Sequence, residues 1–357
     1  MIKYKLKGVC VMNDIGNNLK RIRLLKKMSL KEAGDILNMS AMAVSKYEKG
    51  SIIPNSKKVI EFANAYNVST LEILKVYNPV ELKFTSFRKK KRLSGKNFEL
   101  LKQVINEKVS KYFEVKSLEA YEEDFISMIK FNCNNLNEAE QAALEFRNFI
   151  GISNRQPIID LISILENLGI LFVQIENVNN LFDDFDGLSE MVNDVPVIIL
   201  NENINDGARQ RFTIAHELGH LLLNITDEEY EEKFCNRFAS GLLMPKEAMI
   251  KEFGSKRGNI SFFELKAFKE EYRVSYAAII YRLKDLNIIS EYLYKNLNIF
   301  INSKIGKNDP NPINVEKSNQ FKKSVYRLEA NDIISENKAV ELLGITLDEF
   351  RNENNNY

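Results

Sequence analysis

The chain is poor in the residues on which several classes of protein depend. Its 357 residues include only 3 cysteines, 7 prolines and 15 glycines, and tryptophan is absent. Because Cys10, Cys133 and Cys235 lie far apart and form no CxxC pair, a disulfide framework and a thiolate zinc knuckle are excluded, and reduced thiols are expected. The small share of proline and glycine excludes a collagen-like chain and a disordered one.

Long apolar runs are missing as well. No run approaches the roughly 18 apolar residues of a membrane span, and the segment after Lys3, Lys5 and Lys7 is too short and too broken for a secretory signal. We therefore expect a cytoplasmic protein without a membrane partner. Helical periodicity begins only after Met12, so translation from Met12 is an alternative to translation from Met1.

Charge is distributed unevenly along the chain, although the formal net charge is only +1. Residues 1–116 contain 25 Lys and Arg against 10 Asp and Glu, whereas residues 117–357 contain 25 against 39. The two parts therefore carry formal charges of +15 and −14. This asymmetry is expected when one end of a protein binds a polyanion, and it favours nucleic acid over a simple attraction between two domains.

The basic part begins with a helical pattern. Residues 14–28 have apolar side chains at helical spacing, which predicts an amphipathic helix. Ser29 and Glu32 have the spacing of a capping box, so a second, short helix is expected to begin there. The basic face of the first helix is expected to consist of Lys20, Arg21, Arg23, Lys26 and Lys27.

A tight turn and a third helix follow. Asn38 tolerates the left-handed conformation of a turn, Ser40 can cap the third helix, and Gly50 ends it. In a helix-turn-helix unit the second helix of the pair enters the major groove. Val44 and Tyr47 are expected to face the core. The positions then left to reach base edges and phosphates are Ser40, Ala41, Met42, Ser45, Lys46 and Lys49.

The stretch SAMAVSKYEKG, with the helix VIEFANAYNV after it, resembles the helix-turn-helix domain of Xre/Cro-type repressors. This resemblance implies double-stranded DNA as a partner. Repressors of this type often carry Gln or Arg where this chain has Ala41 and Met42, which points to contacts with thymine methyl groups in A·T-rich sites. Such domains often pair on palindromic sites, so a homodimer is a possible arrangement.

The pattern of the second half changes from helical to extended and back again. The segments ILFVQI (170–175) and VPVIIL (195–200) are rich in branched residues and have the length of strands. Helical patterns precede them, and the helical segment RQRFTIAHELGHLLLN follows. This order of elements predicts an α+β domain with a small sheet.

The helix expected at 208–224 contains His216, Glu217 and His220 as an HExxH motif, and the chain has only these 2 histidines. Histidines four residues apart project from one face of a helix, so both can bind one divalent ion. Glu217 is placed to take a proton from a metal-bound water and pass it to a leaving amine. A pair of core histidines on an apolar helix is the structural alternative.

A catalytic zinc usually takes a third protein ligand, and no histidine remains for that role. An acidic cluster follows the HExxH helix and can supply a carboxylate. Its members are Asp227, Glu228, Glu229, Glu231 and Glu232.

The stretch RQRFTIAHELGH, with CNRFASGLLMP after it, resembles the ImmA/IrrE family of metallopeptidases. The family pattern implies Glu232 as the third ligand, with Glu231 as the alternative. Cys235 stands where the family usually has alanine, which leaves open whether this thiol approaches the metal. Zn²⁺ is the expected ion, and another divalent ion such as Mn²⁺ is the alternative.

The same resemblance implies a zincin-like fold and a proteolytic activity. Several members of the family cleave helix-turn-helix repressors and so relieve repression after stress or in mobile elements, which implies a protein substrate of this class. The strand VPVIIL resembles the edge strand on which zincins lay an extended peptide.

These patterns divide the chain into four parts. We expect an all-α helix-turn-helix domain at 13–77, a basic linker and helical spacer at 78–135 with the charge run Arg88–Arg92, a metallopeptidase domain at 136–290, and a small helical region at 291–357. The expected fold class is mainly α with a small β-sheet (α+β).

Two functional hypotheses follow. The first is a DNA-binding zinc-dependent metalloendopeptidase that cleaves a helix-turn-helix repressor. The second is a transcriptional regulator or antitoxin whose peptidase-like domain serves sensing or dimerisation without proteolysis. The intact His216, Glu217 and His220 favour the first hypothesis.

Overall fold

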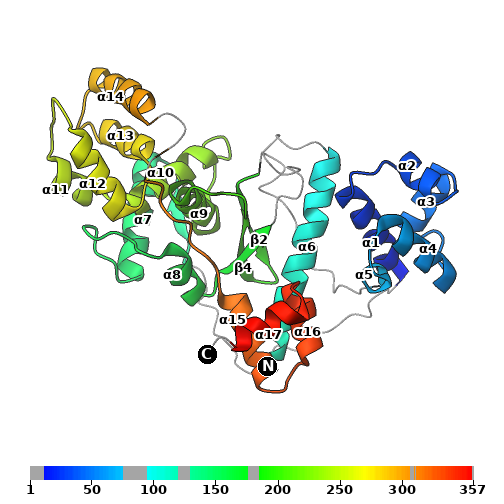
Figure 1. The fold of residues 1–357 in the computed structure, drawn as a ribbon. Coiled ribbons are helices and arrows are strands. Elements are labelled where there is room, and N and C mark those ends of the chain that lie inside the picture. Colours follow the sequence, from blue (N-terminus) through cyan, green and yellow to red (C-terminus); the bar gives the residue numbers. More distant parts are fainter. Residues whose placement is uncertain are drawn as a thin grey trace.

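Helices dominate the fold, and the strands form small sheets (Figure 1). This computed structural model describes residues 12–74, 95–119, 129–175, 185–305, 309 and 311–355. The expected fold class, mainly α with a small β-sheet, is confirmed. The basic run Arg88–Arg92 lies outside the described residues.

The N-terminal unit is a bundle of short helices, and its local signals behave as predicted. Ser29 and Glu32 form the expected capping box, and Ser40 accepts a hydrogen bond from Ala43 at the start of the third helix. Asn38 has the left-handed φ of 50° expected for the turn. The helices are α1 (Met12–Leu25), α2 (Leu30–Ile36), α3 (Ala41–Glu48), α4 (Ser56–Tyr66) and α5 (Thr70–Leu74).

The predicted basic face of α1 is only partly correct. Arg23 is 5% exposed and forms a bidentate ion pair with the buried Glu48 of α3. Arg21 is 8% exposed and pairs with Glu72 of α5 and with Glu107. These two guanidinium groups were expected in solvent because their partners lie far away in the sequence.

Helix α6 (Gly95–Leu118) stands between the N-terminal unit and the sheet (Figure 1). Its buried face, which includes Leu101 and Ile105, shares one apolar cluster with Leu24 of α1 and with Val173 and Ile199 of the sheet. The segment expected to act as a spacer therefore contains a helix that belongs to a core.

The sheet beside α6 has three strands in the order β2-β4-β3. They are β2 (Leu171–Ile175), β3 (Gly187–Val192) and β4 (Val195–Asn201). Strand β4 is parallel to β2 and antiparallel to β3. The prediction that VPVIIL forms an edge strand is wrong, because β4 pairs on both sides and is buried along its length. Among the described strands, β3 is the edge strand nearest to helix α9.

A second and larger apolar core lies on the far side of the sheet from α6 and is built mainly from helices. The short strands β1 (Phe131–Cys133) and β5 (Leu223–Ile225) pair in parallel at its border. Its helices are α7 (Leu136–Phe149), α8 (Leu161–Asn167), α9 (Gly207–Leu222), α10 (Glu231–Leu243), α11 (Lys246–Phe253), α12 (Phe262–Tyr272), α13 (Tyr276–Asp285) and α14 (Glu291–Lys304).

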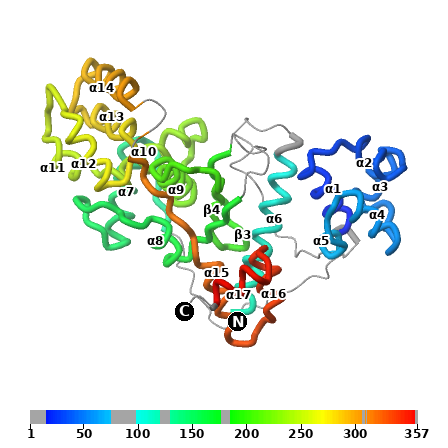
Figure 2. The backbone as a smooth tube through the Cα atoms, viewed as in Figure 1, coloured from blue at the N-terminus to red at the C-terminus, as the bar shows by residue number. Residues whose placement is uncertain are grey.

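The C-terminal helices return to α6. Val115 of α6 shares a cluster with the buried faces of α15 (Gln320–Ala330), α16 (Glu336–Leu343) and α17 (Leu347–Asn355). The extended segment 311–319, which we call the strap, leads into α15 along the second core (Figure 2).

The strap is bound to the N-terminal turns of α9. Gly207 donates its backbone N–H to Ile313, and Glu316 forms a buried ion pair with Arg211. The same carboxylate of Glu316 accepts the backbone N–H groups of Leu161 and Ile162 at the start of α8. The strap therefore ties α8 and α9 to the C-terminal helices.

Within the described part of the chain, no helix has the length and apolar character needed to cross a membrane. The four domain boundaries stay a prediction.

Candidate metal centre and recognition helix

The HExxH motif lies in the second half of α9, packed against α10. Asp206 caps α9 by accepting the backbone N–H groups of Ala208 and Arg209. Gly219 allows the two helices to approach closely, because a Cβ at this position would lie 3.2 Å from the Cα of Cys235. This close packing brings the start of α10 to the two histidines.

Three predicted ligands converge at this helix pair. The Nε2 atoms of His216 and His220 are 3.2 Å apart, and the carboxylate oxygens of Glu232 lie 3.3 Å and 3.5 Å from them. Tetrahedral zinc with bonds of about 2.0–2.1 Å holds neighbouring ligand atoms about 3.3–3.4 Å apart. The spacing of these three groups therefore fits a divalent zinc ion.

The other nitrogen of each imidazole has an oxygen partner. Nδ1 of His216 lies 3.0 Å from Oδ1 of Asn236, and Nδ1 of His220 lies 3.0 Å from Oε1 of Glu231. An Nδ1–H that donates to an oxygen leaves the Nε2 lone pair available for a metal. Glu231, predicted as the alternative ligand, is therefore placed to orient His220.

The hydrogen-bonding partners of His220 favour the protonated, positively charged form of its imidazole. Burial by itself lowers the pKa of His220, but hydrogen bonds with Cys235, Glu231 and Glu232 raise it to about 12. Burial also raises the pKa of the Cys235 thiol, which is fully enclosed and contacts His220. Among the described residues, the possible ligand atoms of His216, His220 and Glu232 all lie within 4.8 Å of one another.

Glu217 connects helix α9, which carries the HExxH motif, to strand β3 of the sheet. Its carboxylate is buried, and Oε2 accepts a hydrogen bond of 2.9 Å from the Ser189 hydroxyl of the edge strand β3. The proposed proton acceptor is thus oriented by a side chain from the strand that borders the site.

Sequence reasoning missed Asn236 and Ser189. Asn236 follows Glu232 by one helical turn, so helical periodicity could have placed it on the same face of α10. Ser189 carried no comparable signal, because its position depends on how β3 packs against α9.

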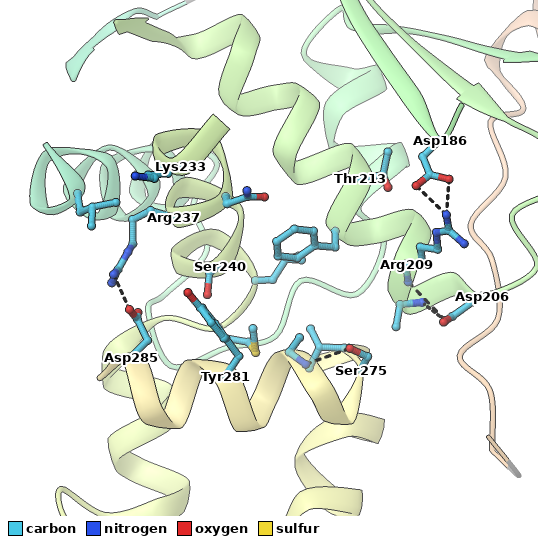
Figure 3. A pocket seen from close by; sticks show the side chains of 18 residues that line it. Asp186, Asp206, Arg209, Thr213, Lys233, Arg237, Ser240, Ser275, Tyr281 and Asp285 are labelled. Carbon is cyan, nitrogen blue, oxygen red and sulfur yellow. Dashed lines mark hydrogen bonds and ion pairs between the residues drawn. The ribbon is translucent and has the colours of Figure 1, made fainter. Parts of the chain in front are cut away.

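A cavity of about 700 Å³ lies beside the centre, between α9, α10 and α13 (Figure 3). Asn236, which contacts His216, is one of its lining residues. The HExxH motif does not predict this cavity.

The recognition helix α3 lies on the opposite side of the N-terminal unit from α6 (Figure 1). Val44 is fully buried and Tyr47 packs against the core, as predicted. Of the side chains predicted to reach DNA, Met42 is 69% exposed and Ser40, Lys46 and Lys49 are exposed, whereas Ala41 and Ser45 are partly exposed.

Comparison with protein families finds two matches in the chain. Residues 19–73 match the family described as Helix-turn-helix, and residues 165–284 match the family described as IrrE N-terminal-like domain. These two matches support a DNA-binding regulator with a metallopeptidase-like domain. More particularly, residues 19–73 match a helix-turn-helix domain of the Xre type and residues 165–284 match an IrrE-like domain, in agreement with the two resemblances seen in the sequence.

Comparison with individual proteins adds little. No curated protein matches the chain. A crystal structure of Bacillus thuringiensis PlcR in complex with the peptide PapR7 and DNA shares 13% identity, over 82% of this chain and 95% of that chain. Its TM-score of 0.18 is too low to support an inference about fold or function.

Proposed function

We propose that this protein is a zinc-dependent endopeptidase that is directed to DNA by its N-terminal unit. The observation that carries the proposal is the convergence of His216, His220 and Glu232 next to a carboxylate, Glu217, that faces an edge strand. A structural pair of core histidines does not require such an arrangement.

His216, His220 and Glu232 would hold the ion, while Asn236 and Glu231 orient the two imidazoles. When bound, zinc supplies a Lewis acid that lowers the pKa of a coordinated water to about 7. Mn²⁺ remains the alternative, because a site of two imidazoles and a carboxylate does not by itself select one divalent ion.

Glu217 would act as the general base. Its carboxylate takes a proton from the attacking water and later gives it to the leaving amine. The hydrogen bond from Ser189 keeps this carboxylate at the edge of β3. An extended peptide can add to such an edge through backbone hydrogen bonds, which bring a peptide bond to Glu217 without a sequence requirement at every position.

The N-terminal unit would bind double-stranded DNA through α3. The exposed side chains of Met42, Lys46 and Lys49 support this role, as does the basic charge of the first third of the chain. A repressor of the helix-turn-helix class is the substrate that the ImmA/IrrE resemblance favours. A peptidase with its own DNA-binding domain would be concentrated where such a repressor is bound.

The test combines metal analysis with cleavage of an Xre-type repressor encoded next to this protein's gene. We expect one zinc per chain and cleavage by the wild type, with loss of cleavage but not of zinc in Glu217→Gln. Glu229→Gln is the matched control, because Glu229 is exposed and precedes α10. Full zinc occupancy without proteolysis would support the alternative, a regulator or antitoxin with a sensing or dimerising domain.

A further inference from the structure

Helix α6 lies between the N-terminal unit and the sheet and contacts both (Figure 1). Toward the N-terminal unit, Glu107 of α6 forms an ion pair of 2.9 Å with Arg21 of α1. Leu24 of α1 is 5% exposed and belongs to the same apolar cluster as Leu101 of α6. A polar contact and an apolar contact therefore join the N-terminal unit to α6.

The contacts of α1 continue to the recognition helix α3. Arg23 of α1 and Glu48 of α3 form a bidentate ion pair, and both side chains are buried. Leu19 of α1 and Val44 of α3 are fully buried in the core of the N-terminal unit. DNA bound at α3 therefore restrains α1 as well, because the two helices share a core and a buried ion pair.

The other side of α6 packs against strand β3. Leu188 and Val192 of β3 are fully buried and belong to the apolar cluster that contains Leu101 of α6. Successive side chains of a strand point to opposite faces, so Ser189 points away from α6. Its hydroxyl donates a hydrogen bond to Glu217. Strand β3 is therefore packed on α6 by one face and bound to helix α9 by the other.

The strap joins α6 to α9 by a second route. Directly after the strap, the ring of Phe321 lies 4.9 Å from the ring of Tyr112 of α6, measured between the centroids. Within the strap, the carboxylate of Glu316 pairs with Arg211 of α9. The backbone of Glu316 forms two hydrogen bonds with the side chain of Gln210, of 2.7 Å and 2.9 Å. The first turns of α9 are therefore attached to α6 through the strap.

Both elements at the proposed base are thus attached to α6, since Glu217 belongs to α9 and its carboxylate is bound by β3. We propose that α6 couples DNA binding to this site, so that DNA bound at α3 stabilises β3 and the start of α9. The coupling goes beyond the proposed function and does not require proteolysis, but it rests on the proposed DNA binding by α3. The DNA-bound chain is then the form in which the base and the edge strand are best ordered.

The first test is hydrogen exchange of the whole zinc-loaded chain, with and without a duplex fragment of the promoter of its own gene. Fluorescence anisotropy establishes saturation with DNA. We expect DNA to slow exchange about fivefold or more at the amides of β3 and at Gly207, whose N–H is bound to the strap. Helix α14 is the internal reference, because it belongs to the second core, away from α6. Equal protection of β3 and α14, or no protection of β3, would overturn the coupling.

A double variant at the contact between α1 and α6 provides the second test. Leu24→Ala with Glu107→Gln removes the apolar and the polar contact described above. Leu37→Ala with Glu99→Gln is the matched control, because Leu37 is buried in the core of the N-terminal unit and Glu99 is exposed on α6. We expect both variants to bind DNA and only the first to lose the protection of β3.

If the first double variant does not fold, Glu107→Gln replaces it, with Glu99→Gln as its control. Protection of β3 that persists in the folded variant would contradict a coupling through α6.

The cleavage assay of the proposed function separates the two proposals. Protection of β3 by DNA in a chain that cleaves no substrate would overturn the peptidase but support the coupling. Cleavage by a chain whose β3 is unaffected by saturating DNA would overturn the coupling alone. Absence of DNA binding in the anisotropy measurement would contradict both the role of α3 and the coupling.

Discussion

The Ser189 hydroxyl donates a hydrogen bond of 2.9 Å to Glu217, joining the edge strand to the metal helix. A hydrogen bond to a charged group contributes about 1.5–3 kcal/mol, which corresponds to about 10- to 100-fold in rate if it is needed in the transition state. We expect Ser189→Ala to lower kcat/KM within this range while zinc content stays unchanged. Ser303→Ala, at an exposed hydroxyl of α14, is the control. Full activity of a folded Ser189→Ala chain would show that Glu217 does not depend on the strand.

The two neighbouring glutamates of α10 are expected to have different effects on metal affinity. Glu232→Gln removes a charged ligand, whereas Glu231→Gln weakens the partner of His220. Loss of such a partner typically costs 10- to 100-fold in affinity, and we expect the loss at Glu232 to be larger. Competition with a chromophoric chelator measures both affinities. If Glu231→Gln loses more metal affinity than Glu232→Gln, Glu231 is the metal ligand and Glu232 is not.

The strap depends on a glycine. A Cβ at Gly207 would lie 2.2 Å from the backbone oxygen of Asn314, whereas a Cβ at Gly258 meets no atom within 4 Å. We therefore expect Gly207→Ala to displace the strap, to lower Tm by several degrees and to expose residues 311–319 to limited proteolysis. Gly258→Ala is expected to leave both measurements unchanged. Equal protease resistance of the two variants would contradict a strap held at α9.

The N-terminal unit offers a test of DNA binding that does not involve the metal centre. Lys46→Ala combined with Lys49→Ala is expected to weaken binding of a promoter fragment and to reduce the slope of log K against log salt by about 2, if both side chains contact phosphates. Fluorescence anisotropy across a salt series measures the slope. If the slope is unchanged in the double variant, Lys46 and Lys49 of α3 do not contact the phosphates of the DNA.

The pair Arg23–Glu48 gives a prediction on stability. Both side chains are buried, so Arg23→Met leaves an uncompensated carboxylate and is expected to destabilise the N-terminal unit by about 3–5 kcal/mol. Adding Glu48→Leu is expected to recover most of this loss. Chemical denaturation followed by hydrogen exchange of the backbone amides of α1–α5 reports on this unit, because the 14 tyrosines of the chain do not separate it from the rest in an optical signal. If the double variant is as unstable as the single one, the ion pair is not the cause.

Local signals predicted the parts of the fold that depend on neighbours in the sequence. The capping box at Ser29 and the turn at Asn38 are set within a few residues, and so is the four-residue spacing of His216 and His220. These features were therefore predictable, together with the helix-turn-helix fold and the presence of a small sheet.

Features set by distant packing were not predictable. The central position of β4 depends on which strands pair with it, and the burial of Arg21 depends on Glu107 of α6. The assignment of Glu231 and Glu232 depends on the rotation of α10 relative to α9, because adjacent residues on a helix differ by about 100°. The cavity beside the metal centre is formed by α9, α10 and α13, and the sequence does not indicate that these three helices lie next to one another.

X-ray absorption at the zinc edge of the purified full chain tests the proposed ligands of the metal directly. We predict one zinc per chain with two imidazoles and only light oxygen or nitrogen atoms at about 2.0–2.2 Å. A sulfur neighbour at about 2.3 Å would assign a ligand role to Cys235 and contradict the proposed set. Zinc bound equally by wild type and by a His216→Ala, His220→Ala double variant would contradict the centre itself.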